Sequence, residues 1–340
     1  MLCLTALSIN TAQAVDVVEP YTLVAGHESL RVWLLSDLPI QPEANASTAA
    51  RISLGKQLFF DPRLSGDKNM ACASCHNPLL GWADGLATGK GFQSQTLPRA
   101  TPTIINTSYN FLQMWDGRKP DLEEQALGPL TSANEMRADL DTIVIWLKQN
   151  NGYKKAFAEA YPDEAISAIT LAKAIATYER TIISNNSAFD RWIKGDPQAM
   201  TAQQIKGFKL FLDPNKGNCV VCHQPGNFVD DGFHNIGLES STNGDLGRFA
   251  QKAVKSMRGS FKTPTLRDIE LTAPYFHNGS AKTLLDVINH YAKGGIHHDN
   301  LSPNMKALTL TQSEKQSLVE FMKALTTPHE PLTLPTLPLN

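Results

Sequence analysis

Four cysteines and two histidines in this sequence have the types and spacing needed to attach haem covalently. They form two Cys-x-x-Cys-His pentapeptides, made of Cys72, Cys75, His76, Cys219, Cys222 and His223. In a c-type haem site each thiol adds to one haem vinyl group, and the adjacent imidazole reaches the iron as proximal ligand. A zinc site or a thioredoxin-like redox pair is the alternative for one isolated copy, but two copies favour haem. The sequence therefore predicts two covalently bound c-type haems, with His76 and His223 as iron ligands.

The segments around the two pentapeptides also repeat. Residues 58–62 read LFFDP before the first cysteine pair, and residues 210–214 read LFLDP before the second. A Thr-Pro-Thr triplet follows each pair, at 101–103 and at 263–265. Repetition over such a distance is typical of two copies of one structural unit. We expect a duplicated one-haem domain, in which each half predicts roles for residues in the other.

Length and composition limit the class of protein. The chain has 340 residues, which suits two domains of ordinary size. Its formal net charge is −2 and its sequence pI is about 6.5, so it offers no basic surface for nucleic acid. Four of the five cysteines belong to the pentapeptides, and the fifth is Cys3 near the N-terminus. We therefore expect neither a nucleic-acid partner nor a disulfide.

Residues 1–14 have the features of a secretory signal peptide. A short apolar run at 2–9 is followed by Ala12-Gln13-Ala14, an A-x-A cleavage site. No other stretch approaches the roughly 18 apolar residues of a membrane span, so no transmembrane anchor is expected. Because c-type haem is attached outside the cytoplasm, we expect an exported periplasmic protein, either free or associated with the cell surface.

Apolar spacings of three and four residues predict a mainly α fold. Helices are expected at 135–150, 153–161 and 164–183, after caps at Ser47, 201–204 and 311–314, and up to Gly294. Gly-rich loops are expected around each haem. The predicted organisation is a signal peptide at 1–14, an N-terminal arm at 15–46, a first haem domain at 47–190, a second at 191–327 and an extended tail at 328–340.

The chain resembles the bacterial dihaem cytochrome c peroxidases and their MauG-like relatives over nearly all of its length after residue 14. The resemblance rests on LGKQLFFDPRLSGD before the first haem site, MWDGRKPDLEEQALGPL after it, and FKTPTLRD with LTAPYFHNGS after the second. It implies two cytochrome c-like domains. It also implies a peroxide-reacting haem in the first, an electron-transfer haem in the second, and often calcium at the domain interface.

The residue facing each haem iron from the distal side decides where peroxide can react, because the iron needs an open or exchangeable sixth position. Tyr291 follows Gly279 at the same distance at which Pro129 follows Gly117. Proline has no side-chain ligand. The repeat therefore predicts a second haem capped by Tyr291 and an uncapped first haem.

Tyr291 also matches the position where MauG-like proteins place a tyrosine ligand and ordinary peroxidases a methionine. An anionic tyrosine favours oxidised iron, whereas methionine raises the reduction potential. If Tyr291 is only a packed helix aromatic, the alternative ligands are Met257, Met305 and His290. No histidine occurs between His76 and His223, so the loop histidine that blocks the first haem of ordinary peroxidases is missing. The first haem should need no reductive activation.

Peroxide cleavage also needs a group that moves a proton between the two peroxide oxygens. The resemblance assigns this role to Glu135, with Gln125 as the distal amide, and it makes Trp115 an electron relay between the haems. Taken alone, Glu135 would be a charge partner of a helix N-terminus and Trp115 a core residue.

The family's calcium site uses main-chain carbonyls at positions that match Thr272 and Pro274. It also uses an asparagine where this chain has Ala100, so one oxygen ligand is missing and a lower affinity is expected. His277 is retained nearby, and we expect it to support the second haem by hydrogen bonding rather than to bind iron.

These features predict a periplasmic dihaem oxidoreductase that reacts with hydrogen peroxide at the first haem. Oxidising equivalents would pass through Trp115 and the second haem to an external donor, which is a small cytochrome, a copper protein or, as in MauG-like enzymes, a protein substrate oxidised at its side chains. In MauG-type electron exit a surface tryptophan stands where this chain has Gly217. The competing hypotheses are a conventional cytochrome c peroxidase, a dihaem electron carrier without peroxidase activity, and a haem-based redox or ligand sensor.

Overall fold

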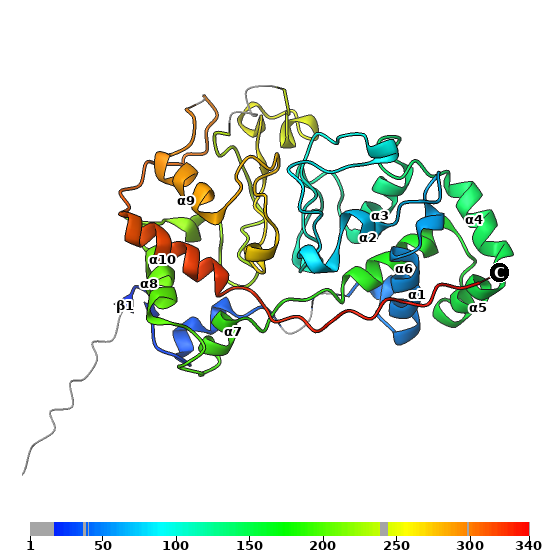
Figure 1. Cartoon of the computed structure of the whole chain (residues 1–340), viewed down its shortest axis with the longest axis horizontal. Coiled ribbons are helices and arrows are strands. Elements are labelled where there is room, and N and C mark those ends of the chain that lie inside the picture. The colour runs from blue at the N-terminus through cyan, green and yellow to red at the C-terminus, as the bar shows by residue number, and fades with distance from the viewer. Residues whose placement is uncertain (1–16, 37–38, 40, 239–243, 298, 340) are drawn as a thin grey trace, which may run out of the picture.

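The computed structural model describes residues 17–36, 39, 41–238, 244–297 and 299–339. This part of the chain is mainly helical, and Figure 1 shows two lobes whose loop regions face each other, with α1 to α6 in the first and α7 to α10 in the second. The α-helices are α1 (Ala49–Phe59), α2 (Cys72–Cys75), α3 (Leu122–Thr131), α4 (Leu140–Gln149), α5 (Asn151–Ala160), α6 (Ala168–Glu179), α7 (Ala188–Ile193), α8 (Ala202–Leu212), α9 (Leu284–Lys293) and α10 (Gln312–Lys323). Two antiparallel pairs of short strands are formed by β1 (Val17–Val18) with β2 (Tyr21–Thr22) and β3 (Phe233–His234) with β4 (Phe261–Lys262).

The first lobe is organised around the crossing of α1 and α6. Gly55 of α1 lies at this crossing, where an added Cβ would be 1.9 Å from the carbonyl oxygen of Ala174. Only glycine allows the two backbones to approach so closely. Phe59, one turn later, is fully buried and packs edge-on against Tyr178 of α6, with ring centroids 5.4 Å apart. The helix pair thereby fixes the segment that leads into the first pentapeptide.

The second lobe repeats this arrangement with α8 and α10. A Cβ added to Gly207 of α8 would lie 2.0 Å from the carbonyl oxygen of Ser317 in α10. The adjacent core is aromatic: the ring of Trp33 lies 5.3 Å from that of Phe208 and 5.2 Å from that of Phe228. The same kind of helix crossing therefore precedes both pentapeptides.

The loops that follow the pentapeptides also share their backbone geometry. Met114 and Phe276 both have positive φ, at 73° and 70°, and the turns end at Gly117 and Gly279 with φ of 64° and 62°. Positive φ is uncommon for residues other than glycine, so these paired turns are an unusual shared feature. Each loop closes on an isolated antiparallel bridge, Gln113 with Lys119 and Tyr275 with Ala281.

Both ends of the described chain cross between the lobes (Figure 1). The N-terminal arm places Trp33 in the second core and then reaches the first lobe, where Asn45 Nδ2 donates to Glu123 Oε1 at 2.7 Å. The C-terminal tail leaves α10 and crosses to the first lobe, where the Pro338 carbonyl accepts a hydrogen bond from Arg63 Nη2 at 3.0 Å. The two segments tie the lobes together.

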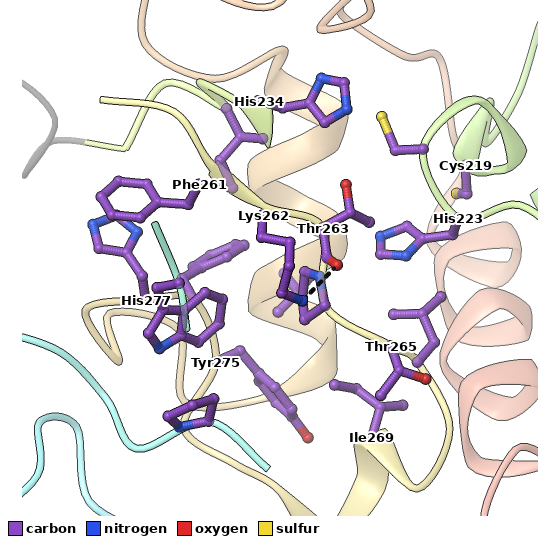
Figure 2. Close-up of a pocket in the computed structure, with 18 of the residues that line it drawn as sticks. Cys219, His223, His234, Phe261, Lys262, Thr263, Thr265, Ile269, Tyr275 and His277 are labelled. Carbon is purple, nitrogen blue, oxygen red and sulfur yellow. Dashed lines mark hydrogen bonds between the residues drawn. The ribbon is translucent and has the colours of Figure 1, made fainter. Parts of the chain in front are cut away.

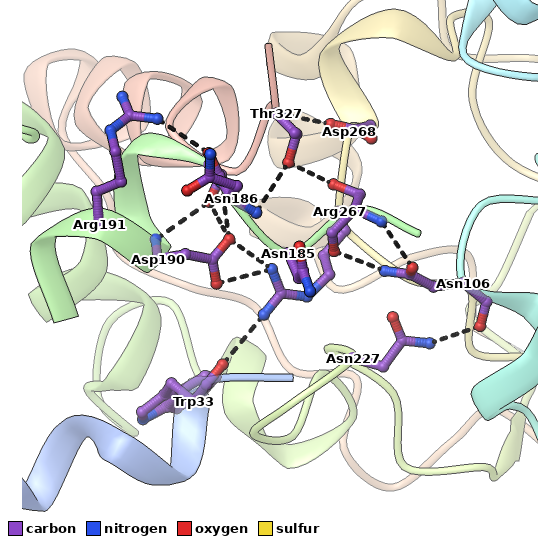
Figure 3. A network of polar contacts seen from close by, with 12 residues as sticks. Trp33, Asn106, Asn185, Asn186, Asp190, Arg191, Asn227, Arg267, Asp268 and Thr327 are labelled. Carbon is purple, nitrogen blue, oxygen red and sulfur yellow. Dashed lines mark hydrogen bonds and ion pairs between the residues drawn. The ribbon is translucent and has the colours of Figure 1, made fainter. Parts of the chain in front are cut away.

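A buried polar network, shown in Figure 3, joins the N-terminal arm to α7 and to the loop after β4. Arg267 Nη1 lies 2.9 Å from Asp190 Oδ2, and both side chains are fully buried. Arg267 Nη2 also donates to the Trp33 carbonyl at 3.1 Å. At the seam between the lobes, Asn227 Nδ2 donates to the Asn106 carbonyl at 3.5 Å. A buried charge without its partner is strongly destabilising, so Asp190 keeps Arg267 in place. Arg267 in turn holds the N-terminal arm through the Trp33 carbonyl.

Some of the predicted elements differ from the structure. The helix expected to start at residue 135 begins at Leu140 instead, because Asp139 caps α4, and Glu135 lies in the preceding turn. The cap expected at Ser47 is provided by Thr48. Helix α3 was not expected, since Pro129 interrupts its pattern.

Other predictions agree with the structure or can be placed in it. The capping boxes at Thr201 and Thr311 and the left-handed Gly294 after α9 are confirmed. The domain boundary expected after residue 190 falls inside α7, whose Phe189 and Trp192 pack in the second core. The signal peptide expected at 1–14 lies outside the described residues. Within the part that is described, no helix is both long and apolar enough to cross a membrane.

Candidate functional site

The first pentapeptide opens onto a cavity of about 740 Å³. Such a volume lies within the range of about 300–1,000 Å³ that is common for ligand sites. The walls come from α2, the loops that follow it, α3 and the turn after α3, and they include Cys72, Cys75, His76, Trp115, Gln125, Pro129 and Glu135. The structure thus brings the residues predicted for the first domain together around one space.

The second pentapeptide opens onto a second cavity, shown in Figure 2. Cys219 and His223 lie on one side of this space, and Phe261 and His277 lie on the opposite side. Its walls also include Cys222, His234, Lys262 and Tyr291. The two cavities therefore have the same core of two thiols and one imidazole.

The two pentapeptide histidines are held in the same way. His76 Nδ1 lies 3.1 Å from the carbonyl oxygen of Trp82, and His223 Nδ1 lies 2.8 Å from that of Phe228. A backbone carbonyl can only accept, so Nδ1 carries the proton and Nε2 keeps its free lone pair for a metal. Burial lowers the pKa of both imidazoles, that of His223 to about 4. Both side chains are therefore neutral and suited to bind iron.

The cysteines complete a donor set that fits covalent haem. In each pentapeptide the backbone N–H of the histidine donates to the backbone carbonyl of the first cysteine at 2.9 Å. This hydrogen bond closes the pentapeptide into one turn beside its cavity. Burial raises the pKa of Cys72 to about 12 and that of Cys75 to about 11, so both remain thiols at neutral pH. The neutral thiols, the imidazole and the adjoining cavity match the requirements of a c-type haem.

The distal side of the first cavity carries an acid and an amide. Glu135 is partly buried in the turn after α3, and burial raises the pKa of its carboxyl group, while the charge of Arg118 acts in the opposite direction. Gln125 on α3 lies with its Nε2 3.8 Å from the sulfur of Met114. Pro129, four residues after Gln125, lines the same cavity without offering a ligand atom.

Tyr291 lines the second cavity from α9, at the repeat position that Pro129 occupies in α3. Its phenol is buried, which raises its pKa, and the neighbouring thiol of Cys222 acts in the same direction. A positive metal ion beside the phenol would oppose this effect and favour the phenolate. At this repeat position the second cavity therefore has a phenol oxygen, whereas the first has a proline without a side-chain ligand atom.

The alternative ligands differ in their access to the second cavity. His290 points its Nε2 to the carbonyl oxygen of Ile236 at 2.8 Å, so that nitrogen is occupied. Met257 lies in the short 3₁₀ turn Lys255–Met257 and does not line the cavity, whereas Met305 does. Tyr291 and Met305 remain as the two candidates.

Trp115 lies in the wall between the cavities and lines both of them. Its Nε1 donates to the carbonyl of Ala100 at 2.9 Å, and its own carbonyl accepts a hydrogen bond from Lys262 N at 2.8 Å. The centroid of its ring lies 6.4 Å from that of His277. One tryptophan thus belongs to the walls of both cavities.

Comparison with known proteins decides the family. Residues 49–198 match the family model of the di-haem cytochrome c peroxidases. The chain is also 42% identical over 298 residues to methylamine utilization protein MauG of Methylorubrum extorquens. This match covers 87% of this chain and 84% of that protein. The chain belongs to the di-haem cytochrome c peroxidase family.

Other members of the di-haem cytochrome c peroxidase family resemble the chain in sequence and in fold. The cytochrome c551 peroxidase of Pseudomonas aeruginosa is 37% identical over 280 residues, covering 79% of this chain and 80% of that protein. A solved MauG-like protein associated with microbial copper homeostasis has a TM-score of 0.79 at 30% identity, covering 85% of this chain and 93% of that one. The diheme peroxidase BthA of Burkholderia thailandensis has the same fold, with a TM-score of 0.72 at 22% identity. The match covers 86% of this chain and 92% of that one. The chain is an enzyme of the di-haem peroxidase type.

The calcium ligands expected from this family lie at the edge of the second cavity. Thr272 and Pro274 both line it, and the Thr272 hydroxyl donates to the Ile269 carbonyl at 3.2 Å. Calcium takes six to eight oxygen ligands, usually with carboxylates among them. In the described chain, the one close group of three His, Cys, Asp or Glu ligand atoms lies beside the second pentapeptide and consists of Cys222, Asp230 and His234. Calcium at Thr272 and Pro274 stays a prediction.

Several polar residues at the cavities were missed by sequence reasoning. Glu179 lines the first cavity, and its Oε2 is buried without a hydrogen-bond partner among the described residues. Burial raises the pKa of its carboxyl group to about 8. At the second cavity, His234 Nε2 lies 2.7 Å from Asp230 Oδ2, and this hydrogen bond raises the pKa of His234 to about 10. Neither residue stands out in the sequence, because Glu179 ends the apolar helix α6 and His234 lies in a stretch that the sequence predicts to be a loop.

A cross-lobe ion-pair network was also missed. Arg99 in the wall of the first cavity pairs through Nη1 with Asp116 Oδ2 at 2.9 Å and through Nε with Asp245 Oδ2 at 2.8 Å. Asp245 belongs to the second lobe, so residues of both lobes enclose the first cavity. No sequence signal links positions so far apart without knowledge of the fold.

Proposed function

We propose that the chain carries two covalent c-type haems, one in each of two cytochrome c-like domains related by internal duplication. The matched pentapeptides, the equivalent histidine hydrogen bonds and the paired turns at Met114 and Phe276 support this proposal. Cys72, Cys75 and His76 would hold the first haem, and Cys219, Cys222 and His223 the second. The protein would act in the periplasm after export, where c-type haem is attached.

The first cavity is the proposed site of reaction with hydrogen peroxide. A haem with an open sixth position supplies the chemistry that splits the peroxide bond. Glu135 would accept the proton of the bound peroxide on a carboxylate oxygen and return it to the departing oxygen. Gln125 would orient the peroxide through its amide. Pro129 offers no ligand atom that could block the space, which supports an open first site.

Trp115 is the proposed route between the two sites. The observation that carries this proposal is that Trp115 lines both cavities, so one residue would lie beside both haems. Oxidising equivalents would pass through Trp115 to the second site, where Tyr291 would cap the haem. Electrons would then return from an external donor, in the MauG-like version a protein substrate oxidised at its side chains.

A second candidate function is a conventional cytochrome c peroxidase that takes electrons from a small cytochrome or a copper protein. Gly217 favours it, because MauG-type exit needs a tryptophan at this position. A Cβ added to Gly217 would lie 2.4 Å from the carbonyl oxygen of Leu210, so no side chain fits without backbone movement. The relatives named cytochrome c551 peroxidase point in the same direction.

Rapid mixing of the oxidised holoprotein with hydrogen peroxide tests the proposal. We expect the haem absorbance to change at once, without prior reduction, and to recover when a donor is added. Recovery with a reduced small cytochrome or copper protein would support the second candidate over the MauG-like version. A spectrum that does not respond to peroxide would leave a dihaem electron carrier as the better description.

A further inference from the structure

The second cavity contains a cation that the proposed reaction does not use. Lys262 is the last residue of β4, and its side chain points into the cavity in Figure 2. Its Nζ donates one hydrogen bond, to the carbonyl of Thr263 at 3.2 Å. A lysine ammonium group has three donor N–H bonds. The remaining donors have no acceptor within the described part of the protein.

The charge of Lys262 is also left without a paired anion. No carboxylate among the described residues lies within ion-pair distance of Nζ, although Asp230 and Asp231 act on it from farther away. On the neighbouring strand, His234 already has Asp230 at 2.7 Å. Lys262 is partly buried, and an unpaired ammonium group removed from water is costly, so buried charges are normally paired. An anion in the second cavity would therefore meet Lys262.

Haem itself supplies such an anion, because it carries two propionate carboxylates at one edge. We propose that Lys262 binds a propionate of the haem in the second cavity and so holds that edge of the haem against Trp115. The backbone supports this arrangement, since Lys262 N donates to the Trp115 carbonyl at 2.8 Å and β4 pairs with β3. Lys262 is in this sense a positioning residue for the route between the sites.

A lysine at this repeat position occurs only in the second half of the chain. Both Lys262 and Ala100 directly precede a Thr-Pro-Thr triplet, so Ala100 is its counterpart in the first half. Alanine cannot bind a carboxylate. A positive charge beside a haem favours the reduced iron over the oxidised iron, so Lys262 would also raise the reduction potential of the second haem.

The test uses the full-length holoprotein with Lys262→Gln, Lys262→Arg and the control Lys306→Gln, an exposed lysine that also lines this cavity. This inference rests on the proposed function, so haem content is measured first by intact mass. A chain with fewer than two haems in the wild type contradicts the proposed function. With two haems present, the following results concern Lys262 alone.

In Lys262→Gln we expect the resonance Raman propionate-bending band of one haem to shift and the midpoint potential of the second haem to fall. Lys262→Arg should remain close to the wild type, because it keeps a cationic donor, and Lys306→Gln should change neither signal. Unchanged signals in Lys262→Gln, or equal changes in the control, would overturn the proposal. If Lys262→Gln does not retain haem, a crystal structure of the wild-type holoprotein decides, because an Nζ farther than about 4 Å from every propionate oxygen is not in an ion pair.

Discussion

The indole of Trp115 packs edge-on against the imidazole of His277, with ring centroids 6.4 Å apart and planes inclined at 68°. His277 in turn stacks on Phe261, with centroids 3.5 Å apart. Trp115 lines both cavities, whereas the other two rings line the second. The three rings form a continuous aromatic contact from the wall of the first cavity into the second.

Trp115→Phe tests whether this contact carries oxidising equivalents. Phenylalanine keeps an aromatic ring but is harder to oxidise than tryptophan, and it removes the hydrogen bond to the Ala100 carbonyl. We expect peroxide to react normally in stopped-flow absorbance, while steady-state oxidation of the donor falls by at least about tenfold, or ~1.4 kcal/mol of barrier. Trp146→Phe is the control, since Trp146 packs on Tyr153 and lines neither cavity. Equal donor oxidation in both variants would argue against the relay.

Glu135→Gln tests the proton-transfer role. Glutamine has nearly the same shape but cannot accept the peroxide proton, so peroxide turnover should fall by about 10² to 10⁴-fold. Haem attachment and the absorbance of both haems should stay as in the wild type. Glu159→Gln, on the exposed face of α5, is the control and should be fully active. Turnover of Glu135→Gln within about twofold of the wild type would exclude Glu135 as the essential base.

The pH dependence provides a second test of Glu135. Burial raises the pKa of this carboxyl group, so its ionised, proton-accepting form is lost at a higher pH than for an ordinary glutamate, whose pKa is about 4.3. Activity should therefore decline as the pH falls through a midpoint above that value. The acid limb should disappear in Glu135→Gln when log(kcat/KM) is plotted against pH. An unchanged limb would assign it to another group.

Gly207→Ala tests the helix crossing that precedes the second haem site. Its new methyl group would meet the Ser317 carbonyl at 2.0 Å, so the two helices must separate. Overpacking of this kind costs about 1–3 kcal/mol, and we expect a lower midpoint of thermal unfolding. Gly128→Ala in α3 is the matched control, because the nearest atom to its new methyl group, Lys119 Cε, would lie 3.8 Å away and alanine stabilises helices. A midpoint equal to the wild type in Gly207→Ala would show that the crossing relaxes freely.

Tyr291→Phe and Met305→Leu separate the two candidate ligands of the second haem. Loss of the true ligand should open that iron and convert its low-spin signal to high-spin in electron paramagnetic resonance (EPR). We expect this change in Tyr291→Phe and not in Met305→Leu. The opposite outcome would make Met305 the ligand and remove the chief MauG-like feature of the second site.

The sequence was most informative where the chemistry is local. A covalent haem requires two cysteines and a histidine at fixed spacing, so Cys72 to His76 could be found without a structure. The internal repeat paired Tyr291 with Pro129, and both line their respective cavities. Helix caps such as Thr201 depend on a few adjacent residues and were also predicted.

Features that depend on distant contacts could not be predicted in this way. Glu135 was placed on a helix, but Asp139 caps α4 and leaves it in a turn. The burial of Glu179 and the unpaired charge of Lys262 follow from how the lobes enclose the cavities, which single-residue patterns do not encode. The position of α7 in the second core likewise results from aromatic packing around Phe189.

The most direct test of the central claim, an open first haem beside a capped second haem, is low-temperature EPR of the oxidised protein as isolated. We expect one high-spin signal from the first haem and one low-spin signal from the second. Two low-spin signals would contradict an open first haem, because a side chain would then cap that iron.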